Sequence, residues 1–281
     1  MTPLNTVVVT GATGNVGGPL VAELAAAGID VRAVSRRTGV DFPPGATPFG
    51  SAIEALTGAD AVFLNSRALS GELEATVTAA RRAGVTRLVA LSAINVDDDF
   101  SRQPSRFRGD RNREVERLAV ESGLEWVSLR PSVFASNFAG MWAAQVRAGD
   151  VIGGPYAAAS TATIADGDVA AVAAKALTTD GSVGQRVSLT GPQALTNAEL
   201  ADVLGSALGR HLRYVEAPPD VVRQRFADIG FPAEFANAYL AMLADTIDRP
   251  ALVTHDVEKI LGRPARTFAQ WASAHRGLFT E

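Results

Sequence analysis

A glycine-rich segment near the start of the sequence has the spacing of a phosphate-binding loop. In VVVTGATGNVG, residues 7–17, three glycines stand three residues apart, directly after a run of β-branched residues. A helix that begins here presents unpaired N–H groups and a partial positive charge, and both attract a pyrophosphate. Gly11 suits the tight turn, Gly14 the close approach of the phosphate, and Gly17 the packing of helix against strand.

The surroundings of this loop favour a dinucleotide over a glycine turn without a ligand. The loop follows an N-terminal strand, opens an amphipathic helix and precedes a second strand at the expected distance. Thr13 and Asn15 add polar side chains beside the phosphates. We assign cofactor binding to the residues of the loop: Gly11, Thr13, Gly14, Asn15, Val16 and Gly17.

The end of the second strand indicates which nucleotide is preferred. Folds that prefer NAD carry an acidic residue here, which accepts a hydrogen bond from the ribose 2′-hydroxyl. This chain instead has Ser35-Arg36-Arg37, and two guanidiniums can pair with a 2′-phosphate or stack on adenine. We expect NADP(H) to be favoured over NAD(H), through Arg36 and Arg37. The alternative is that both arginines are ordinary solvated side chains.

Polar residues at the ends of later strands form a second group of candidates. In open parallel sheets, ligands bind beyond the carboxyl edge. Residues 65–67 end one predicted strand and should lie on the nicotinamide side of the cleft. Ser92 follows another strand, and 131–132 follow a third. The cofactor-binding candidates at these ends are Asn65, Ser66, Arg67, Ser92, Pro131 and Ser132.

The segment after Pro131 supplies candidates for the substrate side. Phe134 and Asn137, with Phe138 and Trp142, could form a wall against a flat substrate. The alternative is that the aromatic residues pack in the core at helical spacing, and that Asn137 caps a helix. We name Asn137, Phe134 and Ser92 as the catalytic candidates.

The strands that carry these candidates alternate with helices. Strands are predicted at 6–10, 30–35, 61–65, 87–91 and 125–130, and helices between them at 16–27, 71–83 and 109–122. The strands are apolar without strict alternation, which is typical of burial on both faces. Residues 1–150 therefore predict an NAD(P)-binding α/β domain, with a Rossmann-type doubly wound parallel sheet.

After this region the alternation of strands and helices ends, and most of the predicted elements are helices. They are predicted at 138–147, 166–178, 197–208, 233–246 and 267–275, with a single strand at 186–190. We expect residues 151–281 to form a small, mainly helical substrate lobe. Within it, residues 166–190 should return to the Rossmann sheet.

Composition excludes several other classes. The 281 residues carry a net charge of −4, which argues against a general nucleic-acid or anionic-membrane surface. Without cysteine, and with three scattered histidines, the chain offers no disulfide or thiolate metal site, and we expect no metal. The N-terminus lacks the basic and apolar regions of a signal peptide, so we expect a cytoplasmic protein that does not enter the membrane.

The motifs together resemble one protein family over nearly the whole chain. TGATGNVG (10–17), LRPSVFASNF (129–138) and DGDVAAVAAKAL (166–177) resemble the NmrA-like branch of the atypical short-chain dehydrogenase/reductases. That branch includes NAD(P)H quinone reductases and NADP-sensing regulators. The resemblance implies a nicotinamide nucleotide as cofactor.

The catalytic pair of ordinary short-chain dehydrogenases is missing. They use Tyr-x-x-x-Lys, in which the lysine lowers the tyrosine pKa for proton transfer. No tyrosine here is followed by lysine four residues later, and the resemblance puts Arg108 and Asn112 at the two places. A quinone needs less acid catalysis than a ketone, so alignment with the nicotinamide can supply most of the rate.

The sequence therefore predicts an NADP(H)-dependent oxidoreductase that transfers hydride to a quinone or another flat conjugated or aromatic acceptor. A non-catalytic NADP sensor, and a reductase component that serves an oxygenase in aromatic polyketide biosynthesis, remain alternatives. A homodimer or a partner enzyme also stays open. The charged run 97–114 is interpreted as a solvated loop and helix start.

Overall fold

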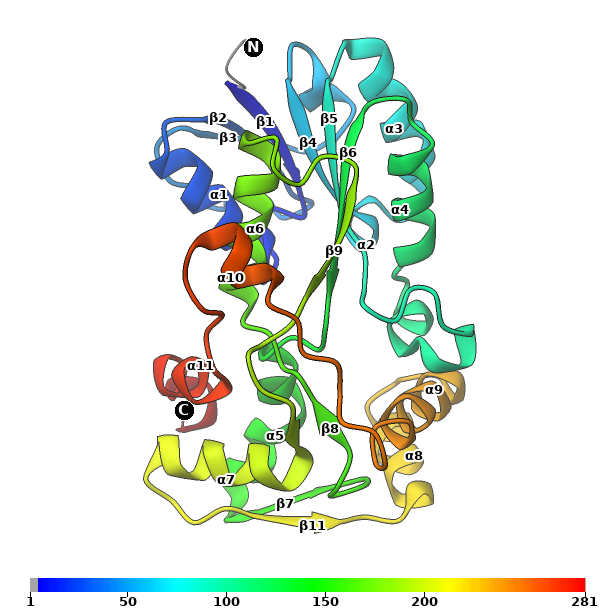
Figure 1. Ribbon diagram of the computed structural model, residues 1–281, viewed down its shortest axis with the longest axis vertical. Helices are drawn as coiled ribbons and strands as arrows, with labels where there is room; N and C mark the ends of the chain where they lie inside the picture. Colours follow the sequence, from blue (N-terminus) through cyan, green and yellow to red (C-terminus); the bar gives the residue numbers. More distant parts are fainter. Residues whose placement is uncertain (1–4, 281) are drawn as a thin grey trace.

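A seven-stranded parallel sheet forms the centre of the computed structural model, which describes residues 5–280. The strand order β3-β2-β1-β4-β5-β6-β9 reverses direction between β1 and β4, which confirms the Rossmann-type α/β fold (Figure 1). In open sheets, ligands bind at this reversal. The strands are β1 (Thr6–Thr10), β2 (Asp30–Val34), β3 (Ala46–Phe49), β4 (Ala61–Asn65), β5 (Arg87–Leu91), β6 (Glu125–Pro131) and β9 (Gln185–Leu189).

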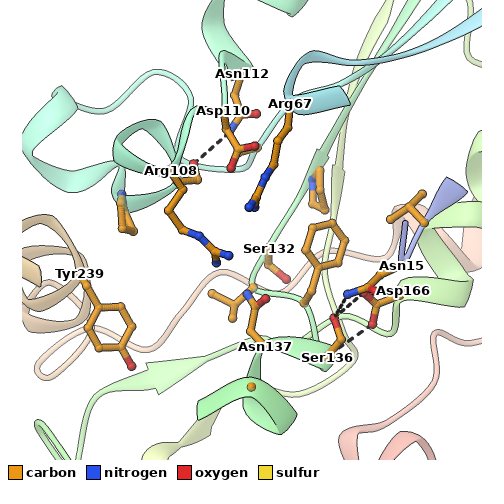
Figure 2. A pocket seen from close by; sticks show the side chains of 18 of the residues that line it. Asn15, Arg67, Arg108, Asp110, Asn112, Ser132, Ser136, Asn137, Asp166 and Tyr239 are labelled. Carbon is orange, nitrogen blue, oxygen red and sulfur yellow. Dashed lines mark hydrogen bonds between the residues drawn. The ribbon is translucent and has the colours of Figure 1, made fainter. Parts of the chain in front are cut away.

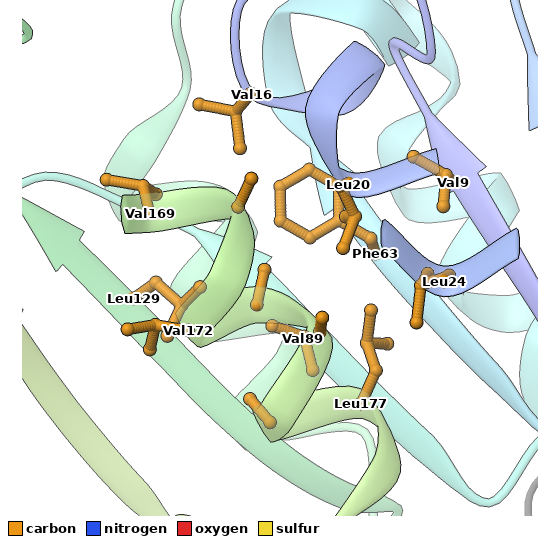
Figure 3. Close-up of a cluster of buried hydrophobic side chains, with 14 of the residues drawn as sticks. Val9, Val16, Leu20, Leu24, Phe63, Val89, Leu129, Val169, Val172 and Leu177 are labelled. Atoms are coloured by element: carbon orange, nitrogen blue, oxygen red, sulfur yellow. The ribbon is translucent and has the colours of Figure 1, made fainter. Parts of the chain in front are cut away.

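Helices cover both faces of this sheet. On one face, α1 (Gly17–Ala26) packs on α6 (Asp166–Thr178), which also contacts α10 (Asp256–Leu261). Figure 3 shows Leu20 of α1 beside Phe63 of β4, and Val172 of α6 in the same buried cluster. The other face is covered by α3 (Leu73–Ala83) and α4 (Asn112–Val120).

The main departure from the expected strands is β3, which joins the edge of the sheet beside β2. Its four residues, Ala-Thr-Pro-Phe, are half-buried or exposed, so they lack the apolar run that marks a central strand. Pro48 is tolerated because an edge strand leaves one row of N–H groups unpaired. A short edge strand of this kind gives little signal in the sequence.

A buried ion-pair network ties α4 to β6 and β9. Glu116 of α4 is 8 % exposed and accepts hydrogen bonds from Arg130 (2.6 Å), Ser128 (2.5 Å) and Arg186 (2.8 Å). Burial alone would raise the pKa of Glu116, but these hydrogen bonds together lower it to about 2. Arg130 also binds Asp97 at 2.7 Å, so the network reaches the loop after β5.

The remaining elements form a lobe beyond the carboxyl ends of the strands (Figure 1). One aromatic-rich cluster joins α5 (Ser136–Ala148), α7 (Asn197–Leu208) and α11 (Phe268–Ala274), and α12 (Gly277–Thr280) packs on α5. Two small strand pairs stiffen the lobe: β7 (Val151–Gly154) with β11 (Arg213–Glu216), and β8 (Ser160–Thr161) with β10 (Leu195–Thr196).

A pair of helices, α8 (Pro219–Asp228) and α9 (Ala233–Ala244), closes the lobe on one side. Helix α9 packs against the 3₁₀ turns η3 (Phe100–Arg102) and η4 (Pro104–Arg108). The lobe therefore reaches back to the loop that follows β5. The short elements η1 (Glu54–Leu56), α2 (Ser66–Leu69) and η2 (Ser70–Glu72) complete the chain. No helix among the described residues is long and apolar enough to cross a membrane.

Candidate active site

A cavity of about 1620 Å³ lies between the carboxyl edge of the sheet and the lobe. Its walls come from the loop after β1, the ends of β2, β4, β5 and β6, the start of α5, and α9. This is the place that the reversal of strand order defines for ligands. The volume exceeds that of a typical pocket for one small molecule, so it suits a nucleotide together with a second ligand.

The glycine loop begins at the wall of this cavity. Gly11 has φ +72°, a left-handed conformation that favours glycine. A Cβ at Gly17 would overlap the carbonyl oxygen of Gly11, whereas a Cβ at Gly14 would meet only that oxygen, at 3.2 Å. Gly17 thus serves backbone packing and does not line the cavity, while Gly14 does. The open cradle at Gly14 fits a bound pyrophosphate.

The other loop residues predicted to bind the cofactor also line the cavity. Asn15 Nδ2 donates to Ser136 Oγ at 2.9 Å, and Ser136 Oγ donates to Asp166 Oδ1 at 2.7 Å (Figure 2). Burial raises the pKa of Asp166, while its hydrogen bonds to Ser136 oppose the rise. This chain links the loop to the starts of α5 and α6. Lining residues of the loop are Gly11, Thr13, Gly14, Asn15 and Val16.

Arg36 and Arg37 lie where the end of β2 meets the cavity. Neither guanidinium forms a hydrogen bond or an ion pair with the rest of residues 5–280, and the backbone N–H of Arg37 donates to Ser35 Oγ at 3.0 Å. Thr13 Oγ1 lies 3.4 Å from the same Ser35 oxygen. Both cations are therefore available to a ligand.

The residues at the end of β4 divide into two groups. Asn65 lines the cavity and its Oδ1 accepts a hydrogen bond from the Arg67 N–H at 3.1 Å, which caps α2. Arg67 also lines the cavity. Ser66 differs from our expectation: it is 2 % exposed, lies outside the cavity and accepts a hydrogen bond from the Arg111 N–H at 3.0 Å. Ser66 is the first residue of α2, and its side chain turns toward the segment before α4 instead of the cavity.

The hydroxyls at the ends of β5 and β6 already have partners. Ser92 Oγ donates to the carbonyl oxygen of Asn112 at 3.2 Å, and Ser132 Oγ donates to that of Ala162. Ser92, Pro131 and Ser132 all line the cavity, but the two serines have their protons committed to backbone oxygens. The two hydroxyls therefore help to form the cavity wall and are poorly placed to donate a proton to a ligand.

The substrate-side candidates also divide into residues that line the cavity and a residue that lies in the core of the lobe. Phe134 and Asn137 line the cavity, and Figure 2 shows Asn137 pointing into it. The Asn137 side chain makes no hydrogen bond within the described part of the chain, so it does not cap α5. Phe138 is 3 % exposed and packs edge-on against Trp142 at 4.8 Å and Phe268 at 5.4 Å. Phe138 therefore belongs to the lobe core, although Trp142 still reaches the cavity.

The charged run contributes residues that the sequence analysis had interpreted as solvated. Arg108 and Asp110 line the cavity, and Figure 2 shows them beside Arg67. Burial raises the pKa of Asp110, while burial and the nearby charge of Arg67 lower the pKa of Arg108. In the sequence, the only indication that Arg108 reaches the cavity is the family resemblance, which puts this residue at the place of the usual catalytic tyrosine.

Two of the three tyrosines line the cavity. Tyr214 donates its hydroxyl to the carbonyl oxygen of Pro155 at 2.7 Å, and burial raises its pKa. Burial raises the pKa of Tyr239 to about 12. Tyr156 lies outside the cavity, as do both lysines, Lys175 and Lys259.

The fold and the cavity define a nucleotide-binding protein of the Rossmann class with room for a second ligand. The chain belongs to the NmrA-like family, which matches residues 3–251.

Curated relatives support an enzyme. A (4-alkanoyl-5-oxo-2,5-dihydrofuran-3-yl)methyl phosphate reductase of Streptomyces griseus is 36 % identical over 97 % of this chain and 99 % of its own. An NAD(P)H azoreductase of Xenophilus azovorans is 35 % identical over 80 % of this chain and 78 % of its own. The chain is accordingly an NAD(P)H-dependent oxidoreductase of the NmrA-like family.

Solved structures agree in fold. An NADPH-dependent quinone oxidoreductase of Escherichia coli, complexed with NADPH, matches with a TM-score of 0.74 at 21 % identity, over 95 % of this chain and 99 % of that one. The negative transcriptional regulator NmrA, in complex with NADP, gives a TM-score of 0.74 at 18 % identity, and the match covers 98 % of this chain and 96 % of the regulator. Enzymes and a regulator thus share this architecture.

Proposed function

We propose that this protein is an NADP(H)-dependent reductase that passes hydride to a quinone or another flat conjugated acceptor, without a tyrosine–lysine pair. The observation that carries the proposal is one continuous cavity, which joins the glycine loop and Arg36 to Phe134 and Asn137. No lysine lines it. Related enzymes named as azoreductase and quinone oxidoreductase have acceptors with conjugated double bonds.

Each part of the cavity has a separate task in this proposal. The glycine loop holds the pyrophosphate, and Arg36 and Arg37 hold the 2′-phosphate. When bound, the nicotinamide supplies the hydride. Phe134 and Asn137 orient the acceptor, and the lobe around α9 keeps water from it. A short distance and a fixed orientation between the reacting groups are worth several orders of magnitude in rate.

The tyrosines in the cavity are poor substitutes for the missing pair. The Tyr214 proton is committed to Pro155, and a pKa of about 12 makes Tyr239 a weak acid at neutral pH. Neither has a lysine beside it to lower that value. The reduced oxygen of a quinone can instead take its proton from water.

The first test replaces the cavity side chains one at a time. Tyr214→Phe and Tyr239→Phe should retain quinone reduction within about tenfold, because general acid catalysis contributes about 10²–10⁴-fold where it is used. Phe134→Ala and Asn137→Ala should lower kcat/KM by about 100-fold, since small misplacements of the acceptor are costly. The measurement is NADPH oxidation with menadione. A thousandfold loss in a folded tyrosine variant that still binds NADPH would contradict the proposal.

A nucleotide sensor is the second candidate, favoured by the shared fold with a transcriptional regulator. A sensor should bind NADP⁺ and NADPH and oxidise no acceptor. The same menadione assay, extended to polycyclic ketones, separates the two. Activity that appears only with an added oxygenase would instead favour the reductase-component alternative.

The preference for NADP(H) is tested by Arg36→Ala combined with Arg37→Ala. Each charge-assisted hydrogen bond to the 2′-phosphate contributes about 1.5–3 kcal/mol. The double variant should therefore lose roughly 100-fold or more in affinity for NADPH and little for NADH. Fluorescence titration with both nucleotides measures this. Equal losses for the two nucleotides would show that the arginines do not read the 2′-phosphate.

A further inference from the structure

We propose that Arg67 and Arg108 form a binding site for an anionic group on the acceptor itself, of the phosphate-ester class. The proposal deepens the function given above, because it assigns a charged substituent to the substrate of the same cavity. It rests on two arginines from distant parts of the sequence that the fold brings to one wall.

The two guanidiniums converge from different elements. Arg67 lies on α2, directly after β4, and Arg108 ends the turn η4. Figure 2 shows both side chains directed toward the interior of the cavity, with Ser132 and Asn137 opposite them. Arg108 lies over the ring of Phe231, 5.0 Å from its centroid. This contact holds the Arg108 side chain in place against the lobe.

Neither guanidinium has a hydrogen-bonding partner in the described residues. Their neighbours in the structure show the contrast: Arg106 pairs with Glu114 at 2.9 Å and Arg130 with Glu116 at 2.6 Å. Two cations directed into the same space repel each other, and the charge of Arg67 contributes to the lowered pKa of Arg108. A doubly charged anion between them would relieve this repulsion and accept several hydrogen bonds.

The single carboxylate nearby does not fill this role. The charges of Arg67, Arg108 and Arg111 act to lower the pKa of Asp110, yet its carboxylate forms no ion pair with them within 4.0 Å among residues 5–280. Burial raises the pKa of Asp110, against the lowering effect of the three arginines. The guanidiniums of Arg67 and Arg108 therefore keep their hydrogen-bond donors free for a bound anion.

This site is separate from the part of the cavity assigned to the nucleotide phosphates. The glycine loop follows β1 and Arg36 follows β2, whereas Arg67 follows β4, on the other side of β1 in the sheet. Arg108 comes from a turn that packs against α9 of the lobe. An acceptor bound there would have its flat ring near Phe134 and its anionic group between the two arginines.

The test measures binding, which does not depend on turnover. The probes are 1-naphthyl phosphate and its neutral analogue 1-naphthol, titrated calorimetrically into the protein saturated with NADP⁺. The phosphate should bind at least about tenfold more tightly than the alcohol. Raising the salt from 0.05 to 0.5 M should remove most of that difference, because screening weakens the charged contacts. This comparison needs no variant.

Variants then locate the site. Arg67→Gln and Arg108→Gln should each weaken naphthyl phosphate binding by roughly tenfold or more, with a smaller effect on naphthol. Arg81→Gln removes the same charge from the exposed end of α3, outside the cavity, and should change neither affinity. Equal affinity of the two probes for the wild type, or an equal loss in the Arg81 variant, would overturn the proposal.

Two further measurements distinguish this proposal from alternative roles of the two arginines. If the arginine variants lose NADP⁺ affinity as much as naphthyl phosphate affinity, the two side chains hold the cofactor and the acceptor site is refuted. If they instead lower kcat on neutral menadione without changing naphthyl phosphate binding, they act on the developing charge of the acceptor oxygen, which also refutes it. Failure of the wild type to oxidise NADPH with menadione contradicts only the proposed function.

Discussion

Gly14→Val is expected to weaken NADPH binding by at least about 100-fold, or about 2.7 kcal/mol, while the protein stays folded. At Gly14 a Cβ meets one atom, the Gly11 oxygen, at 3.2 Å, and otherwise faces the cavity. The branched side chain would fill the space in which the phosphates approach the backbone. Fluorescence titration with NADPH gives the affinity, and thermal unfolding without nucleotide gives the stability.

The neighbouring glycines supply the controls. Gly18→Ala places its methyl 3.7 Å from the Ala12 oxygen, an ordinary contact, and should keep both affinity and stability. Gly17→Ala would overlap the Gly11 carbonyl group, so it should lower stability as well as affinity. Full NADPH affinity in a folded Gly14→Val protein would mean that the loop does not bind the pyrophosphate.

Glu116→Gln should lower the free energy of unfolding at pH 7 by about 3 kcal/mol. The carboxylate accepts hydrogen bonds from Arg130, Ser128 and Arg186, and its side chain is 8 % exposed. Removal of its charge leaves the half-buried guanidinium of Arg130 facing a neutral amide, and losing one partner of a buried pair costs about 3–5 kcal/mol. Guanidinium chloride unfolding measures the difference.

The pH dependence of the stabilisation by Glu116 follows from its lowered pKa in the folded protein. The pKa of Glu116 falls from 4.5 to about 2 on folding, so the unfolded chain binds the proton first. The stabilisation is therefore complete above pH 4.5 and is lost as the pH falls toward 2. The gap between wild type and Glu116→Gln should close over this range.

A nearby surface pair provides the matched comparison. Glu121 lies just after α4 and pairs with Arg117 at 2.6 Å, with both side chains more than half exposed. Exposed pairs contribute about 0–1 kcal/mol, so Glu121→Gln should change the unfolding free energy little at any pH. If the two variants were equally stable at pH 7, the Glu116 network would not hold α4 to the sheet.

The network also bears on the cavity, since Arg130 connects Glu116 to Asp97. Asp97 lies in the loop that leads to η3 and η4, and η4 carries Arg108. Loss of Glu116 should therefore loosen the wall that holds Arg108. In the naphthyl phosphate titration this predicts a weaker effect than Arg108→Gln, because the guanidinium itself remains.

The sheet and its cofactor loop could be predicted from the sequence because their signals are local. Five apolar strands and the helices between them were placed to within a few residues, as was β9. The spacing of Gly11, Gly14 and Gly17 indicated a tight glycine loop after β1, and this loop borders the cavity, since turn conformation depends on the residues in the turn. The edge strand β3 and the short lobe strands β7, β8, β10 and β11 were not predicted, because they are too short or too exposed to show a pattern.

The substrate side of the cavity was decided by tertiary structure. In the sequence, Asn65, Ser66 and Arg67 are equivalent candidates, yet Ser66 turns into the protein and its neighbours face the cavity. Phe134 and Phe138 are likewise equivalent there, although of the two only Phe134 borders the cavity. The direction of each side chain depends on the neighbouring element it packs against, and that element is often far away in the sequence.

The sequence by itself determined the fold class, the glycine loop after the first strand and the absence of a Tyr-x-x-x-Lys motif. Only the folded chain brought Arg108 and Asp110 to Arg67, more than 40 residues away in the sequence. In the sequence they belong to a charged run of the kind that usually faces solvent. They line the cavity because α9 packs on η4 and Phe231 lies beneath Arg108. These are contacts between distant segments, and no local periodicity reports them.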